Sequence, residues 1–333
     1  MLKILLIVIV VIVVSLLAFS KYILNMVFNV RYDGNPNLIY KTNKDFKGLK
    51  ADDVTFKSGE NVLKGSFYYT DKNYKDLVIF THGFGEGHHA YTTEINTIAN
   101  NGHLVFSYDN TGCVNSEGKS IISFYQAVKD LKAAFNYLEE TEYNNWPIKC
   151  VGHSWGGYTA INSLTISNKV EKVAAFAPLN DPTVSICDTV GANLGFNANF
   201  LMPFIKFWLW MLDKENGYRS CADILANTDK KVLVVQGTKD QSVFYKSSVA
   251  VDQRVIDNKN VTISIKEDRL HNPYQSKRSE DYLVTTFSKI SELAKSKKPE
   301  DKIELEKMYK NIDYSLITEE DEETMKEFLN FIK

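Results

Sequence analysis

The sequence predicts an α/β fold in which helices cover both faces of a doubly wound, mostly parallel sheet. Three features predict it: short apolar runs recur along the chain, helix-length intervals separate them, and the apolar residues take a helical period between positions 120 and 140. Strands buried on both faces are continuously apolar, and strands that alternate with helices build parallel βαβ units. With 333 residues, 44% of them hydrophobic, the chain can bury such a core without disulfides or metals.

The predicted sheet begins after position 50. Residues 54–57 and 62–69 are predicted to pair as strands around a turn at 58–61. One amphipathic helix is predicted within 120–140, because its apolar residues share a single stripe. The other strands are predicted from short apolar runs, of which the last alternates with polar residues as a strand nearer the sheet edge does: 77–80, 104–106, 148–151, 173–176, 232–235 and 261–265.

Two segments interrupt this alternation. Residues 182–228 are too long for a simple crossover and are rich in aromatic residues, so they are predicted to form a helical cap insertion. A packed helical layer and a contact with a membrane surface are the alternative interpretations of these aromatic residues. Residues 272–317 are rich in Lys and Glu and are predicted to be a solvated helical insertion. Thr318 is then expected to cap a final helix that runs through Ile332.

Residues 1–30 are predicted to be an N-terminal transmembrane anchor, because residues 4–20 contain no charge and consist mainly of Ile, Val and Leu. A helix of that length spans roughly 25 Å, slightly less than a hydrocarbon core of about 30 Å. The apolar sequence that continues after Lys21 adds to its length. A signal peptide cut after Ser20, which would leave a secreted protein, and a buried core helix are the alternatives.

The predicted organisation is therefore an anchor, a polar linker at 31–50 and one folded domain at 51–333. Lys3 stands on one side of the apolar run and Lys21 and Arg31 stand on the other, so the flanking charges give only a weak signal of orientation. The tail before the run has only three residues, which favours a cytoplasmic N-terminus. We therefore expect a single-pass membrane protein whose N-terminus is cytoplasmic and whose folded domain lies outside the cytoplasm.

Charge and cysteine content exclude several classes of function. The formal net charge is −2, from 39 basic and 41 acidic residues, so the concentrated basic face of a nucleic-acid-binding protein is not expected. The four cysteines are scattered, without a CxxC pair or a histidine at metal-ligand spacing, so neither a metal nor a cofactor is predicted. A disulfide between Cys187 and Cys221 is left open by their spacing.

The strongest chemical signal is the sequence Gly152-His153-Ser154-Trp155-Gly156, which follows a predicted strand and precedes a helical run. A nucleophile elbow needs this strand–turn–helix setting, because its central residue is held in a strained backbone conformation. The flanking positions leave no room for side chains, and the glycines at 152 and 156 meet that requirement. Ser154 is therefore predicted to be a catalytic nucleophile.

His271 is the predicted general base, because it alone of the six histidines follows the last predicted strand and lies C-terminal to both the serine and a candidate acid. Asp240 is the predicted acid, since it comes directly after the strand 232–235, at the end where such sheets place functional loops. A carboxylate there fixes the imidazole tautomer and stabilises the imidazolium. Asp268 is the rival acid but lies close to His271 in sequence, and Asp109 is assigned a turn or capping role.

The turn His82-Gly83-Phe84-Gly85 follows the predicted strand at 77–80. Its glycines allow backbone N–H groups to approach a ligand closely. The N–H groups of Phe84 and of Trp155, the residue after the serine, are therefore predicted to form an oxyanion hole.

From about position 55 to position 271 the sequence resembles the serine aminopeptidase and monoacylglycerol-lipase-like branch of the α/β hydrolases. The matching motifs are His82-Gly83-Phe84-Gly85, Asp109-Asn110-Thr111-Gly112 leading to Ser116-Glu117-Gly118, Gly152-His153-Ser154-Trp155-Gly156, Gly237-Thr238-Lys239-Asp240 and His271-Asn272-Pro273. The resemblance implies the α/β-hydrolase fold and the same roles for Ser154, Asp240, His271, Phe84 and Trp155. It implies little about the substrate, because the branch includes esterases, lipases, thioesterases and peptidases.

The predicted function is hydrolysis of a small-molecule carboxylic ester with a hydrophobic acyl group, through an acyl-enzyme. An aminopeptidase-type hydrolase or a thioesterase would use the same residues, and an acyltransferase would differ only in excluding water. The hypothesis from another class is a non-catalytic binding protein on a hydrolase scaffold. The completeness of the predicted triad and oxyanion hole argues against it.

Overall fold

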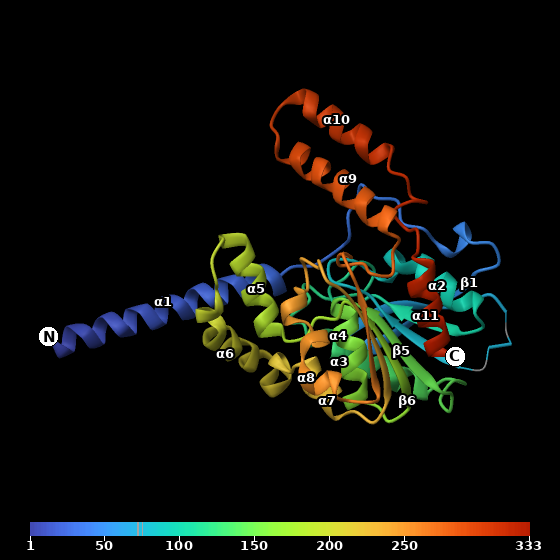
Figure 1. Cartoon of the computed structure of the whole chain (residues 1–333), viewed down its shortest axis with the longest axis horizontal. Helices are drawn as coiled ribbons and strands as arrows, with labels where there is room; N and C mark the ends of the chain where they lie inside the picture. The colour runs from blue at the N-terminus through green and yellow to red at the C-terminus, as the bar shows by residue number, and fades with distance from the viewer. Residues whose placement is uncertain (72, 75) are drawn as a thin grey trace.

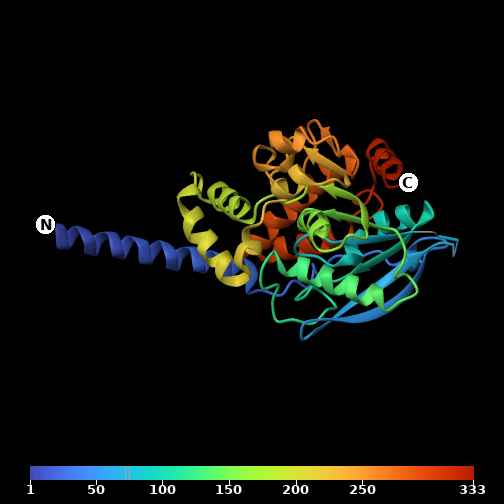
Figure 2. The ribbon, with the colours of Figure 1, turned by 90° about the horizontal axis from the view of Figure 1, so that it is seen from below.

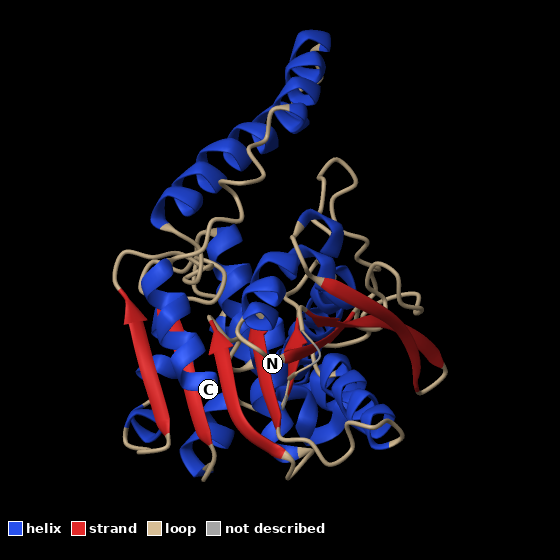
Figure 3. Ribbon diagram, turned by 90° about the vertical axis from the view of Figure 1, so that its right-hand side faces the viewer, coloured by secondary structure: helices blue, strands red, loops and turns tan. Residues whose placement is uncertain are grey.

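A computed structural model describes residues 1–71, 73–74 and 76–333 and contains one eight-stranded sheet in the order β1-β2-β4-β3-β5-β6-β7-β8 (Figures 1 and 3). β2 pairs antiparallel with β1 and with β4, and every other pair of neighbours is parallel. The predicted doubly wound α/β fold is therefore confirmed. The strands are β1 (Lys50–Ser58), β2 (Asn61–Tyr69), β3 (Leu77–Thr81), β4 (Leu104–Tyr108), β5 (Ile148–His153), β6 (Val170–Phe176), β7 (Lys231–Gly237) and β8 (Val261–Lys266).

Two apolar layers form because successive strand residues point to opposite faces of the sheet. On one face, alternate residues of the central strands pack with α3 (Gln126–Glu139), α4 (Trp155–Asn162) and the short helix α8 (Gln253–Ile256). On the other face, the intervening residues pack with α2 (Thr92–Asn100) and α11 (Glu322–Ile332). The central strands are thus buried on both sides, which is why their sequences are continuously apolar.

The ends of two helices differ from the prediction. α3 begins at Gln126 and not near position 120, because the N–H groups of Ile121 and Ile122 bond to Val30 and Phe28 carbonyls instead of starting a helix. α11 is capped by Asp321, whose carboxylate accepts the Thr324 N–H at 2.9 Å. The expected cap at Thr318 is wrong.

The hydroxyl of Thr318 has other partners. It donates to the Tyr314 carbonyl oxygen and accepts a hydrogen bond from the Lys41 ammonium. Because Asp321 stands directly before the helix and Thr318 does not, the carboxylate reaches the free N–H groups of the first turn.

The two predicted insertions are helical. The first contains α5 (Pro182–Leu194), α6 (Met202–Asp213) and α7 (Cys221–Asn227). α5 begins at the capping carboxylate of Asp181 with a proline in its first turn, and it ends at Gly195, whose φ is 73°. The second insertion forms the helical hairpin of α9 (Lys277–Lys295) and α10 (Pro299–Lys310), which projects at the top of Figure 1.

The N-terminal apolar run is one continuous helix, α1 (Leu2–Phe28), with a mean hydropathy of 3.2 in its most apolar window. Of the helices in the described residues, it alone is long and apolar enough to cross a membrane. Its first half is exposed, whereas Leu24 and Phe28 are buried in the core of the folded domain. The Phe28 ring meets the Phe124 ring edge-on at 5.0 Å between centroids. The C-terminal half of α1 is therefore part of the domain.

The linker is also packed against the domain and is not a free polar spacer. The Arg31 guanidinium donates to the carbonyl oxygens of Val114, Ser116 and Gly118, and Tyr32 forms a β-bridge with Cys113. A buried carbonyl needs a donor, and this segment supplies three such bonds. The start of the linker is therefore fixed to the folded domain.

The four cysteines are free and buried, so Cys187 and Cys221 form no disulfide in the structure. Both belong to the same apolar core as α4, where they pack as small apolar side chains.

Because α1 packs against the domain through one side, two alanine substitutions on this helix should differ in their effect on stability. Phe28→Ala should lower the free energy of unfolding by about 3–5 kcal/mol, because a buried aromatic side chain is removed. Met26→Ala is the matched control, since Met26 is 60% exposed on the same helical turn. Thermal unfolding of both full-length variants in detergent measures the difference, and equal melting temperatures would show that α1 is not docked.

Candidate active site

Ser154 lies in the sharp turn between β5 and α4, at the carboxyl end of the central strand. Its backbone takes φ 57° and ψ −118°, a combination that L-residues rarely adopt. Two hydrogen bonds hold the turn: the Ser154 N–H donates to Phe176 O at 2.8 Å, and the Leu179 N–H donates to Ser154 O at 3.1 Å. The neighbouring strand therefore supports the strained residue.

The two glycines of the motif are required by space. A Cβ at position 156 would stand 1.9 Å from the Thr81 carbonyl oxygen, and a Cβ at position 152 would stand 2.3 Å from the Gly156 oxygen. The Thr81 hydroxyl bridges the same place by donating to Gly156 O at 2.7 Å. The predicted lack of room for side chains is therefore present at both positions.

The two residues of the predicted oxyanion hole lie side by side. The rings of Phe84 and Trp155 are 5.8 Å apart between centroids, and the Trp155 indole N–H donates to Phe124 O at 2.7 Å, which fixes the ring. Trp155 is the first residue of α4, so its backbone N–H has no partner within the helix. An oxyanion hole at these two residues stays a prediction.

His271 and Asp240 are brought together from the loops after β8 and β7. His271 Nδ1 lies 2.8 Å from Asp240 Oδ2, so the imidazole donates to the carboxylate and its Nε2 is left as an acceptor. The other carboxylate oxygen accepts the N–H groups of Ser242 and Val243 at 2.8 and 2.9 Å. Burial raises the pKa of Asp240, but the hydrogen bond and charge of His271 and these backbone bonds outweigh it, so the pKa is lowered overall.

The two other carboxylates considered from the sequence lie elsewhere. Asp268 is exposed and pairs with the Lys239 ammonium at 2.8 Å, which lowers the pKa of Asp268. Asp109 is buried and accepts from His88 Nδ1 at 2.7 Å and from the N–H groups of His88 and Asn115. It holds the turns after β3 and β4 together, in line with the structural role predicted for it.

A hydrogen-bonded chain that the sequence did not reveal links three loops of the site. The Gly83 N–H donates to the Tyr91 hydroxyl at 3.0 Å, and that hydroxyl lies 2.9 Å from His153 Nδ1. His153 Nε2 lies 3.0 Å from the carbonyl oxygen of His271. A neutral imidazole protonated at Nε2 satisfies every contact, with Tyr91 O–H donating to Nδ1.

The charge state of His153 agrees with this tautomer. Burial, and after it the nearby His271, lowers the pKa of His153 to about 3. His153 is therefore neutral near pH 7, and it positions the Gly83 turn relative to the His271 loop. No sequence pattern could have paired Tyr91 with His153, because α2, β4 and α3 lie between them in the chain.

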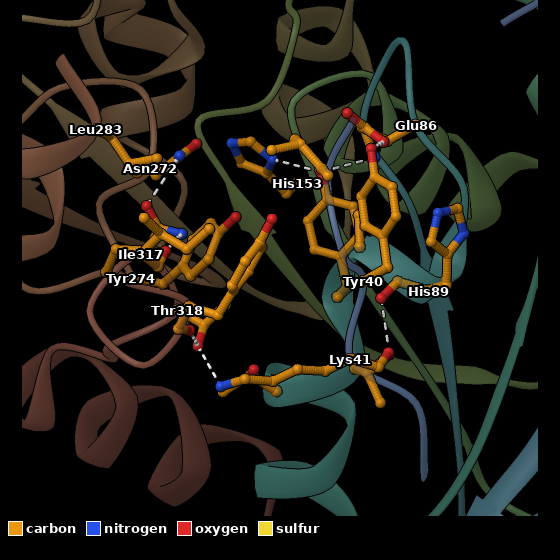
Figure 4. A pocket seen from close by; sticks show the side chains of 18 of the residues that line it. Tyr40, Lys41, Glu86, His89, His153, Asn272, Tyr274, Leu283, Ile317 and Thr318 are labelled. Carbon is orange, nitrogen blue, oxygen red and sulfur yellow. Dashed lines mark hydrogen bonds between the residues drawn. The ribbon is translucent and has the colours of Figure 1, made fainter. Parts of the chain in front are cut away.

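A cavity of about 420 Å³ lies over these residues and is lined by both Ser154 and His271 (Figure 4). In Figure 4, Tyr40 and Glu86 stand on one side of the cavity, and Asn272 and Tyr274 stand on the other. The walls combine aromatic and aliphatic side chains with many polar ones, among them Lys41, Glu86 and Asn272.

Much of the cavity wall comes from segments that sequence reasoning did not connect with the site. The linker contributes residues 38–41, and the second insertion contributes side chains from α9 and from residues 314–318. Lys41 Nζ donates to Thr318 Oγ1 at 2.6 Å and so joins these two segments. Among the described lining residues none belongs to 182–228, which favours the non-cap interpretations of that insertion.

Glu86 is the carboxylate in the cavity wall, one residue beyond the glycine turn. It accepts the Tyr40 hydroxyl at 2.7 Å. Burial raises the pKa of Glu86, and the hydrogen bond from Tyr40 offsets part of that shift. The linker is thus tied to the turn that carries Phe84. Among the described residues, no group of three or more His, Cys, Asp or Glu side chains is arranged to hold a metal.

The chain Gly83–Tyr91–His153 predicts a loss on Tyr91→Phe. Removing this hydroxyl leaves two buried groups unpaired, so the variant should lose about 1–3 kcal/mol of unfolding free energy. Tyr108→Phe is the matched control, because the buried Tyr108 hydroxyl has no partner in the described part of the chain. Thermal melts of both variants give the comparison, and an equal loss at the two positions would contradict the inferred chain of bonds.

Comparisons with known proteins agree with this fold. The family model of the serine aminopeptidases (S33) matches residues 72–215. An esterase from Pyrococcus furiosus has a TM-score of 0.56 and 20% identity, over 73% of this chain and 91% of the esterase chain. An acylaminoacyl peptidase from Pyrococcus horikoshii has a TM-score of 0.53 and 17% identity, over 69% of this chain and 40% of the peptidase chain.

No curated protein sequence matches this chain significantly. The residues that match the family model include the turn after β3, the Ser154 turn, and α5 and α6 of the first insertion. For the residues outside this match, the fold is assigned from the order of the strands and from the similar solved structures. The chain therefore has the α/β-hydrolase fold.

Proposed function

We propose that this protein is a serine hydrolase that cleaves carboxylic esters, with Ser154 as nucleophile, His271 as general base and Asp240 as the orienting acid. The observation that carries the proposal is the hydrogen-bonded pair of Asp240 and His271 beside a cavity that also exposes Ser154 in its strained turn. A serine that lines the cavity on such a turn, an imidazole held through Nδ1 and a buried acid are the parts that acyl transfer needs.

In the proposed reaction, His271 Nε2 takes the hydroxyl proton as Ser154 Oγ attacks the carbonyl carbon of the ester. The resulting oxyanion accepts hydrogen bonds from the backbone N–H groups of Phe84 and Trp155, and Asp240 stabilises the imidazolium. Collapse of the tetrahedral intermediate breaks the bond to the alcohol oxygen, which takes the proton from His271. Water, activated by the same imidazole, then hydrolyses the acyl-enzyme and restores the serine.

The cavity supports an ester of modest size with an apolar acyl group. Its volume of about 420 Å³ lies at the lower end of ordinary ligand sites, and its walls include Leu283, Phe287 and Ile317. Burial of each acyl methylene would contribute about 0.8 kcal/mol until the cavity is full. A thioester of similar shape would fit the same site, so a thioesterase is the close alternative.

Glu86 supports a second candidate, an aminopeptidase-type hydrolase. A half-buried carboxylate in the same cavity as Ser154 is suited to pair with the ammonium group of an aminoacyl substrate. A panel of p-nitrophenyl esters with short and long acyl chains, beside aminoacyl p-nitroanilides, separates the two candidates. Glu86→Gln would weaken only the aminoacyl substrates if Glu86 binds an amine.

We further propose that α1 is retained as a membrane anchor and that the folded domain lies outside the cytoplasm. The indole N–H of Trp208 donates to the Leu17 carbonyl oxygen at 3.0 Å, and Ser20 is buried. A signal peptidase cut after Ser20 would remove both contacts, so the packing supports retention.

Ser154→Ala should abolish ester hydrolysis and labelling by a fluorophosphonate probe, with a loss on the order of 10⁴-fold or more, because triad members act as a unit. The fold should persist, since only a hydroxyl is removed. Ser163→Ala is a control, because the Ser163 hydroxyl donates to a carbonyl within the adjacent helix. A folded Ser154→Ala protein that retains near-native turnover would refute the proposal.

Asp240→Asn should reduce turnover far more than Asp268→Asn, because only Asp240 contacts His271. The amide cannot stabilise the imidazolium and permits the wrong tautomer, which lowers turnover in such triads by up to about 10⁴-fold. Steady-state kinetics of both variants on one ester measure this. The reverse ranking would move the acid to Asp268.

A further inference from the structure

The first insertion carries a cluster of exposed apolar side chains, which we call the 194–212 face. Its seven large side chains are between 37% and 51% exposed: Leu194, Phe196, Phe200, Phe207, Trp210, Met211 and Leu212. Lys206 is the only charged residue between positions 194 and 212. Exposed apolar clusters of this kind on a soluble surface mark contacts with proteins or membranes.

The 194–212 face is next to the proposed membrane helix. α6 packs directly against α1, and Trp208 bonds to the Leu17 carbonyl oxygen. The ammonium of Lys21 stands 4.9 Å above the Trp208 ring. In both views α5 and α6 are the part of the domain that reaches furthest along α1 (Figures 1 and 2).

The register of α1 fixes the depth of this contact. The uncharged stretch between Lys3 and Lys21 is roughly 25 Å long at 1.5 Å per residue, and a hydrocarbon core is about 30 Å thick. The apolar residues Leu24 and Phe28 after Lys21 are buried in the folded domain, so they do not lengthen the membrane segment. Leu17 must therefore lie at or within the boundary of the hydrocarbon core. Because Trp208 is bonded to Leu17, α6 must lie at the same depth.

The side chains around α6 are those that occur at a membrane interface. Tryptophan and lysine are common there, since the ring prefers the headgroup level and the ammonium reaches to water. Lys206 and Lys214 lie 4.3 Å from the ring centroids of Tyr218 and Trp210, respectively. Their charges also suit anionic headgroups.

We propose that the 194–212 face is a second membrane contact, seated in the headgroup region of the leaflet from which α1 emerges. The inference rests on the proposed role of α1 as an anchor, and it adds that the folded domain is fixed against the bilayer and does not hang from a tether. The occupant of this face is a lipid bilayer. A second copy of the chain is the alternative that the experiment must separate.

The test uses the full-length chain in vesicles of phosphatidylcholine and phosphatidylglycerol. Phe207→Cys and Met211→Cys are each labelled with the environment-sensitive fluorophore NBD, and the unsubstituted protein measures any labelling of the four buried native cysteines. Val284→Cys and Ile303→Cys are matched controls, because these residues are 51% and 58% exposed on α9 and α10, away from α1. The fluorescence is measured with and without brominated phosphatidylcholine.

A blue-shifted emission that brominated lipid quenches at positions 207 and 211, but not at 284 and 303, is the expected result. Emission at 207 and 211 that matches the controls would overturn the second contact while leaving the anchor intact. A blue shift without quenching would assign the face to a protein partner and would also overturn it. Failure of the full chain to sediment with vesicles would overturn the anchor and the second contact together, whereas ester hydrolysis would be unaffected.

Discussion

The close contact between the start of α4 and the end of β3 is the constraint on which the candidate site depends. It exists because position 156 has no side chain, so that the Thr81 carbonyl oxygen and the helix backbone approach within a distance that excludes a Cβ. This contact brings the turn after β3, with Phe84, beside the Ser154 turn. The strain at Ser154 is tolerated because hydrogen bonds from β6 and the following loop fix the same turn.

Burial keeps two of the histidines around this contact neutral. It lowers the pKa of His82 to about 4 and the pKa of His153 to about 3, so both are neutral at physiological pH. Each then bonds through one donor and one acceptor: His82 contacts Gly83 O and the Asn110 N–H. These two rings position loops, whereas His271 is partly exposed to the cavity and pairs with a carboxylate. Histidine thus has a structural role at positions 82 and 153, whereas we propose that it transfers a proton at position 271.

The local features of the fold could be predicted from the sequence, because a buried strand, a strained turn and its glycines each depend on neighbouring residues. The walls of the cavity could not, since residues 38–41 and 314–318 are far apart in sequence and meet through the hydrogen bonds of Lys41 with Thr318 and of Ile39 with Tyr314. The start of α3 was misplaced because backbone bonds to α1 and its following residues compete with the helix there. Periodicity records which residues are apolar, but not which segment supplies their partners.

The same stretch of chain links the proposed membrane anchor to the cavity. α1 ends in the domain core at Phe28, Arg31 is bonded to three carbonyl oxygens, and Tyr40 reaches Glu86 in the cavity wall. Few residues in this path are free to move independently. A change in the position of α1 would therefore alter the shape of the cavity. A membrane helix attached by a flexible spacer would not transmit the position of the bilayer to the candidate active site. With α1 anchored as we propose, the helix enters the domain core and the segment after it forms part of the cavity wall, so the bilayer would influence the shape of the site.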